Sequence, residues 1–316
     1  MSAAQPPPAA AAESLHGVLF SDGCSLGEAT VPYAVKLVQG PVTIPSRPPL
    51  WRREDRGAHY LSINAIYASD EGCVLRIDCQ GRGAFAIEDH QITVDWQGGT
   101  SFHHYLQTLG LSLWLERQGV PCLHANTLAI DECTAIGLLA PSQGGKSTLS
   151  AALAARGMAL MSDDMAALYP SRQPGAGVYP ARAQLRLWPD ALAQLPDARE
   201  ARDCPRVHER FDKRLMTLPR SVQGQRRLTH LFILDRCDDA TTDISLDAVP
   251  PADALIHCLR QSMLADAYEP MGLAHRRVAV LARALAGMKV WRLRYGSSHE
   301  RIGDVAHALA QHVQRA

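Results

Sequence analysis

The sequence reads Ala-Pro-Ser-Gln-Gly-Gly-Lys-Ser-Thr from Ala140 to Thr148. This follows the pattern G-x-x-x-x-G-K-[ST], with Ala140 in place of the first glycine. In that pattern the glycines let backbone N–H groups point at phosphate oxygens, while the lysine and the hydroxyl after it serve the β- and γ-phosphates and Mg²⁺. The stretch therefore predicts a site for a nucleoside triphosphate. The residues expected to bind it are Ser142, Gln143, Gly144, Gly145, Lys146, Ser147 and Thr148.

The flanking sequence has the order that such a loop requires. A short apolar run, Thr134 to Leu139, precedes the loop and predicts a strand. An Ala/Leu-rich stretch, Leu149 to Ala155, follows it and predicts a helix that stops at Gly157. The alternative, a Gly-Gly turn beside an incidental lysine, is the weaker interpretation in this context.

Two adjacent carboxylates, Asp163 and Asp164, follow the next apolar run, Met158 to Met161. A helix of about ten residues runs roughly 15 Å away from the loop, and a strand of similar length returns. Both carboxylates should then lie beside the loop, at the carboxyl end of the strand, where ligands bind in such sheets. One can hold Mg²⁺ together with Ser147, and the other can accept a proton. The sequence does not say which does which, and a solvated strand end remains the alternative.

A Leu-Arg-Leu alternation predicts that Arg186 points away from its two leucine neighbours. Such a guanidinium could offset phosphate charge during a transfer reaction. An ordinary exposed strand residue is the other interpretation.

The remaining chain suggests two domains. Residues 1–14 begin as a Pro/Ala arm with nothing to pack and are expected to be disordered. Short apolar segments between Gly, Pro and Asp clusters predict a β-rich domain over residues 15–118 that ends in a linking helix from His103 to Gln118. Residues 119–316 then form the nucleotide-binding domain.

The composition limits the classes of partner. Of the 316 residues 47% are hydrophobic, and Lys plus Arg equals Asp plus Glu at 32 each, so no global field favours nucleic acid or an acidic membrane. The eight cysteines include no C-x-x-C pair, and no apolar stretch approaches the about 20 residues that span a bilayer. We expect a cytoplasmic protein, and the sequence leaves open whether it forms a symmetric homo-oligomer.

Three segments in this order and spacing resemble the HPr kinase/phosphorylase family. They are Leu123-His124-Ala125, the loop from Ala140 to Thr148, and Leu160-Met161-Ser162-Asp163-Asp164. The resemblance implies an α/β fold shared with the nucleotide domain of phosphoenolpyruvate carboxykinase, a smaller N-terminal β-rich domain, and His124 near the transferred phosphate. An imidazole there could hydrogen-bond a phosphate oxygen or the acceptor, or could be a buried structural histidine.

The sequence is most similar to a divergent branch of that family, which includes kinases of lasso-peptide precursors. The Gly-rich E-x-R-G-L-G motif of the HPr kinases themselves is not found after the acid pair, which moves the expected acceptor away from HPr. The leading hypothesis is an ATP- and Mg²⁺-dependent kinase that phosphorylates a serine of a peptide or small protein. A small-molecule kinase, which needs an enclosed pocket, and a nucleotide-gated scaffold protein are the alternatives.

Overall fold

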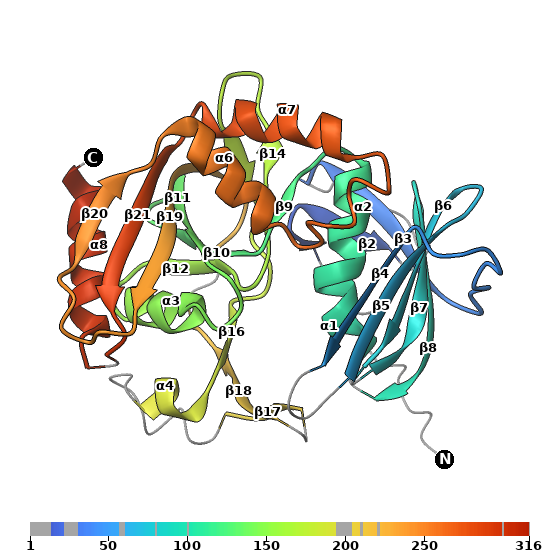
Figure 1. Cartoon of the computed structure of the whole chain (residues 1–316), viewed down its shortest axis with the longest axis horizontal. Coiled ribbons are helices and arrows are strands. Elements are labelled where there is room, and N and C mark those ends of the chain that lie inside the picture. The colour runs from blue at the N-terminus through green and yellow to red at the C-terminus, as the bar shows by residue number, and fades with distance from the viewer. Residues whose placement is uncertain are drawn as a thin grey trace, which may run out of the picture.

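The structure, a computed structural model, describes residues 14–21, 31–56, 61–79, 81–99, 101–193, 204–208, 211–219, 222–298 and 300–315. The predicted disordered arm lies outside this range, apart from Ser14. Figure 1 shows two sheet-containing parts joined along one side of the molecule.

The N-terminal part is an eight-stranded sheet in the order β1-β2-β3-β8-β7-β6-β5-β4. Its alternating burial fits the strand pattern of the sequence, with Leu75, Phe85 and Ile92 among the side chains that turn into the core. The strands are β1 (Ser14–Leu15), β2 (Val18–Ser21), β3 (Tyr33–Gln39), β4 (Trp51–Arg56), β5 (Leu61–Ala68), β6 (Gly72–Asp78), β7 (Gly81–Glu88) and β8 (Gln91–Gly99).

The predicted linking helix is present but irregular. It consists of α1 (Phe102–Tyr105), a π-helical turn η1 (Leu106–Gly110) and α2 (Leu111–Arg117). Ser101 caps its start by accepting a hydrogen bond from the His103 N–H at 3.3 Å. The apolar periodicity predicted the helix but not the π turn, because both forms bury a similar stripe of side chains.

The second part contains the sheet β12-β10-β11-β19-β15-β14, to which β21 and β20 are added beside β19. Its strands are β10 (Ala125–Ala129), β11 (Thr134–Leu139), β12 (Ala159–Ser162), β14 (Tyr169–Pro170), β15 (Ala176–Val178), β19 (Arg226–Cys237), β20 (Ser245–Ala248) and β21 (Lys289–Gly296). The three longest strands of this sheet, β11, β19 and β21, are mutually parallel.

The predicted strand–loop–helix–strand unit is present, as β11, the loop, α3 (Lys146–Ala154) and β12. β12 runs parallel to β11, but the two strands are not neighbours. β10 lies between them and is antiparallel to both. This insertion matters for the site, because it brings a third strand to the place where the loop and the acid pair meet.

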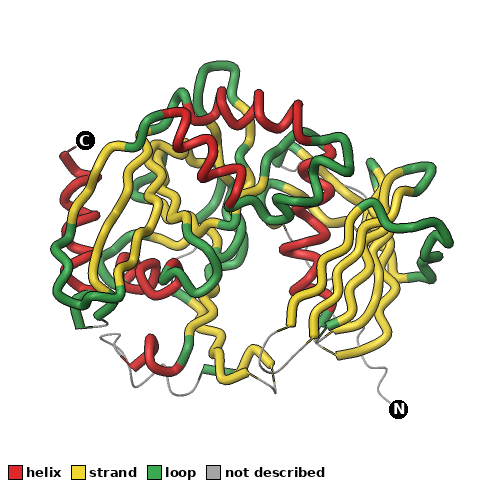
Figure 2. Tube along the Cα trace, in the orientation of Figure 1, coloured by secondary structure: helices red, strands yellow, loops and turns green. Residues whose placement is uncertain are grey.

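Helices cover both faces of this sheet (Figure 1, Figure 2). On one face α3 and α8 (Ile302–Arg315) pack over Leu138, Phe232 and Leu293. On the other, α6 (Pro251–Arg260) and α7 (Ala274–Leu285) pack over Ala135, Leu231 and Val290.

A small third sheet, in the order β16-β18-β17, carries Arg186. It consists of β16 (Gln184–Leu187), β17 (Arg206–His208) and β18 (Phe211–Thr217), and α4 (Pro189–Ala193) follows β16. Two short strands, β9 (Cys122–Leu123) and β13 (Ala166–Ala167), form a separate pair.

The two parts share a core and a buried ion pair. Glu116 on α2 and Arg277 on α7 lie 2.9 Å apart with side chains 2% and 3% exposed. The same Glu116 oxygen accepts the Cys122 N–H at 2.8 Å, and Arg277 donates to Ser262 Oγ at 2.6 Å. This network fixes the start of the second part against the helix that precedes it. No helix in the described ranges is long and apolar enough to cross a membrane.

Candidate functional site

The loop between β11 and α3 turns tightly at the start of the helix. Gln143 and Gly145 both have positive φ, 65° and 88°. A side chain on Gly144 would come within 2.7 Å of the Ala140 Cβ, so this position requires glycine. Gly145 is the N-cap of α3 and no side chain caps the helix there, which leaves its first N–H groups and the positive end of its dipole directed at the loop.

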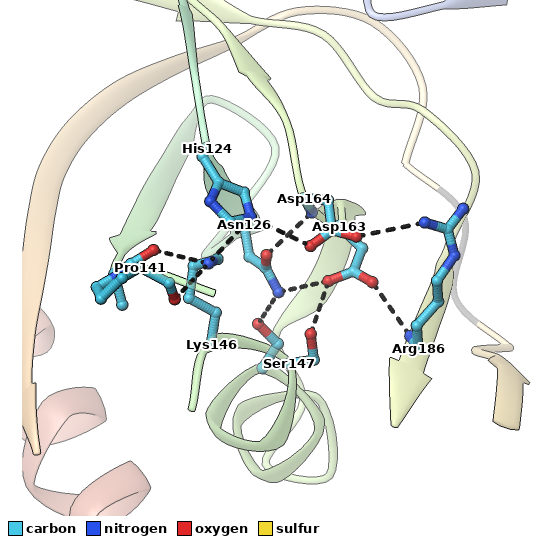
Figure 3. A network of polar contacts seen from close by, with 10 residues as sticks. His124, Asn126, Pro141, Lys146, Ser147, Asp163, Asp164 and Arg186 are labelled. Atoms are coloured by element: carbon cyan, nitrogen blue, oxygen red, sulfur yellow. Dashed lines mark hydrogen bonds and ion pairs between the residues drawn. The ribbon is translucent and has the colours of Figure 1, made fainter. Parts of the chain in front are cut away.

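Lys146, the first residue of α3, is 5% exposed. Its Nζ donates to the carbonyls of Ala140 at 2.8 Å and Pro141 at 3.2 Å, and lies 3.3 Å from His124 Nε2 (Figure 3). Burial lowers the pKa of Lys146, and the nearby carboxylates of Asp164 and Asp163 oppose this shift. The ammonium thus lies under the loop with acceptors on several sides.

Asp163 lies beside the first turn of α3. Its Oδ1 accepts from Ser147 Oγ at 3.0 Å and from Asn126 Nδ2 at 2.8 Å, while its Oδ2 accepts from the Arg186 N–H at 3.1 Å. Burial and the neighbouring Asp164 charge raise the pKa of Asp163 to about 7, against the lowering effect of Arg186. Asp163 is therefore the acid of the pair whose protonated form the surroundings favour.

Asp164 faces the cationic side of the site and has an unusual backbone, with φ at 67°. Its carboxylate lies 3.6 Å from His124 Nε2 and 3.4 Å from Arg186 Nη1. Burial disfavours the ionised form, but the hydrogen bond to His124 and the charges of Arg186 and Lys146 outweigh it and hold the pKa of Asp164 well below its usual value. The surroundings of the two adjacent acids thus shift their pKa values in opposite directions.

Two cavities adjoin these residues. The larger, of about 280 Å³, is lined by Asp164, His124 and Arg186 and by all seven loop residues that the motif predicted. The smaller, of about 50 Å³, is lined by Asp163 and again by Arg186. The acid pair and Arg186 therefore stand between the two cavities.

Within the described ranges, no group of three or more His, Cys, Asp and Glu side chains could hold a metal ion by itself. Mg²⁺ commonly binds through one or two carboxylates plus substrate phosphates and water. The oxygens of Ser147, Asp163 and Asp164, gathered beside the loop, fit that kind of site. They do not fit an all-protein metal cage.

The structure brings together every residue that the sequence singled out here. The loop, the acid pair, His124 and Arg186 lie around one point, and Arg186 points away from buried Leu185 and Leu187 as its alternation predicted. Sequence reasoning missed Asn126. This side chain is fully buried. Its Nδ2 donates hydrogen bonds to Ser150 Oγ and to Asp163 Oδ1, and its Oδ1 accepts a hydrogen bond from the Asp164 N–H at 3.1 Å. The available signal was a polar pair, Asn126 and Thr127, within the short strand at 125–129.

No protein-family model and no curated protein matches the chain. A solved structure, the HPr(Ser) kinase/phosphatase from Coxiella burnetii, is similar to it over 61% of this chain and 97% of the Coxiella chain, with 14% sequence identity and a TM-score of 0.33. At this identity and TM-score the similarity assigns no activity to the chain.

Proposed function

We propose that this protein is an ATP- and Mg²⁺-dependent kinase that transfers the γ-phosphate to the hydroxyl of a serine in a peptide or small protein. The observation that carries the proposal is the convergence of three parts at one point. These are a glycine-rich loop at the start of α3, a buried lysine under that loop, and two carboxylates with opposite pKa shifts beside it.

The loop and Lys146 would hold the phosphates. Backbone N–H groups at the uncapped start of α3 suit the binding of an anion, and a lysine with lowered solvation interacts strongly with it. The carbonyls of Ala140 and Pro141 now accept hydrogen bonds from Lys146, so a triphosphate would compete with them for the ammonium.

The two carboxylates would divide the work. Asp164 remains ionised and lines the larger cavity with Ser147, which suits it to hold Mg²⁺, an ion that would neutralise charge on the phosphates. Asp163 lines the other cavity and has its pKa raised to about 7, which suits a general base at neutral pH. Arg186, at the boundary, could offset the charge that develops on the transferred group.

The chemistry is an in-line transfer. The serine hydroxyl would lose its proton to Asp163 while its oxygen bonds to the γ-phosphorus, and the bond from that phosphorus to the bridging oxygen would break to release ADP. Such transfer depends mainly on positioning and charge neutralisation, which the fixed hydrogen bonds of Asp163 and Asp164 would supply.

The test is incubation of the protein with γ-labelled ATP, Mg²⁺ and a set of serine-containing peptides and small proteins, followed by mass spectrometry for phosphoserine. We expect phosphoserine in at least one acceptor, formed at least about 100-fold more slowly by the Asp163→Asn variant. Absence of transfer to every acceptor, with ATP bound but intact, would refute the proposal in favour of a nucleotide-gated binding protein.

A further inference from the structure

The smaller cavity, of about 50 Å³, is built from segments far apart in the sequence. Asp163 and Arg186 form one side. His16, Gln107 and Thr108 of the N-terminal part form another, and Gln184 of β16 completes the wall. Nothing in the nucleotide-binding motif calls for a contribution from the first 118 residues. Their presence beside the acid pair therefore needs a separate explanation.

The turn between β1 and β2 is fastened to the second part of the chain. The His16 N–H donates to the Pro180 carbonyl at 2.9 Å, and the Tyr169 hydroxyl donates to the His16 carbonyl at 2.6 Å. His16 is 4% exposed and has a φ of 52°. The positive φ of His16, and of Gly17 at 78°, is what the two-residue turn between β1 and β2 requires. The hairpin thus places a buried histidine at the edge of this cavity.

The π-helical turn is a further independent sign. Gln107 and Thr108, which line the cavity, lie inside η1 between two α-helical segments. Single π turns within helices occur frequently at functional sites.

We infer that this cavity receives the hydroxymethyl group of the phosphate acceptor, and that the N-terminal β-rich part forms one wall of the acceptor subsite. The inference rests on the proposed function. A hydroxyl placed there would lie beside Asp163, and Arg186 would lie between it and the cavity that the loop lines.

The cavity can hold a small polar group. The space open to the centre of a water-sized sphere is about 50 Å³, and a single water needs about 10 to 15 Å³ of such space. A hydroxymethyl group therefore fits, with the rest of the acceptor left outside.

The test compares two acceptor probes, N-acetyl-L-serine methylamide and glycerol, at high concentration with ATP and Mg²⁺. Thr108→Phe fills the cavity, and Gln107→Met removes its carboxamide at nearly constant size. Gln118→Met is the matched control, since Gln118 belongs to the same helical stretch, is half-buried like Gln107, and does not line the cavity. Thermal unfolding and ATP affinity are measured for each variant.

We expect Thr108→Phe to lower kcat/KM for the serine probe at least about tenfold, and Gln107→Met to raise its KM, with ATP affinity unchanged. Gln118→Met should behave as the wild type. The inference is overturned if folded Thr108→Phe phosphorylates the serine probe normally, or if Gln107→Met matches Gln118→Met. Should Thr108→Phe fail to fold, Gln107→Met decides. A wild type that prefers glycerol, or that transfers phosphate to neither probe nor to any peptide, would instead refute the proposed function.

Discussion

The carboxamide of Asn126 lies 2.8 Å from Asp163 Oδ1 and donates to it, while its own oxygen accepts the backbone N–H of Asp164 at 3.1 Å (Figure 3). One buried side chain on β10 thus orients both acids. Groups that orient catalytic residues in this way typically contribute about 10- to 100-fold to activity.

We therefore expect Asn126→Ala to reduce phosphate transfer about 10- to 100-fold and to leave the Kd for ATP within a few-fold. Steady-state kinetics and a separate nucleotide titration distinguish the two effects. Equal losses of affinity and rate would mean that Asn126 supports the whole loop rather than the acid pair.

Asp163→Asn removes the proposed base while it preserves shape. Loss of a general base costs about 10² to 10⁴ in rate, so transfer should fall by that factor while nucleotide binding persists. Rates are measured in single turnover, so that product release does not mask the chemical step. Undiminished transfer in this variant would exclude Asp163 as the base.

Lys146→Met should weaken ATP binding about tenfold or more, because a charge-assisted hydrogen bond contributes about 1.5 to 3 kcal/mol. The shape of the buried stem is largely kept, which limits structural damage. Lys36→Met on the exposed face of β3 is the matched control, and isothermal titration with a non-hydrolysable ATP analogue is the measurement. Matching affinities in the two variants would contradict a role of Lys146 in phosphate binding.

Two histidines predict how stability depends on pH. Burial lowers the pKa of His16 to about 4, and burial together with the charge of Arg186 lowers the pKa of His104 to about 3. In the unfolded chain both titrate near about 6.5, so below that pH the unfolded state binds protons that the folded state does not. The contribution of these two histidines to stability should then fall as the pH drops from about 6.5 toward the folded values, while the raised pKa of Asp163 acts in the opposite direction.

The measurement is Tm between about pH 7 and about pH 4.5 for the wild type and for His104→Gln. The variant should show the smaller loss. His90→Gln, at an exposed position, is the control and should follow the wild type. An identical slope in all three proteins would rule out the contribution assigned to His104.

The buried pair Glu116–Arg277 makes a separate stability prediction. Arg277→Met leaves the Glu116 carboxylate buried without its partner, which should cost about 3 to 5 kcal/mol of unfolding free energy. The double variant Glu116→Gln with Arg277→Met removes the orphaned charge and should recover part of the loss, as measured by urea unfolding. A double variant that is less stable than the single one would contradict this account.

Local sequence patterns were enough to predict β11, the loop and α3. They also predicted that Asp163 and Asp164 lie beside the loop. Their cues are local: an apolar run, glycines where the backbone is strained, and a helix whose length fixes where the next strand begins. The alternation around Arg186 likewise fixed the direction of its side chain. Each of these features depends on backbone geometry over a short stretch of chain.

Tertiary structure alone decided the rest. It inserted β10 between β11 and β12, which brought Asn126 to the acid pair. It also carried His16 and Gln107 from the N-terminal part to the cavity beside Asp163. These contacts join residues far apart in the chain, and they depend on which strands pair and how the cores pack, so no local pattern of hydrophobicity or turns encodes them.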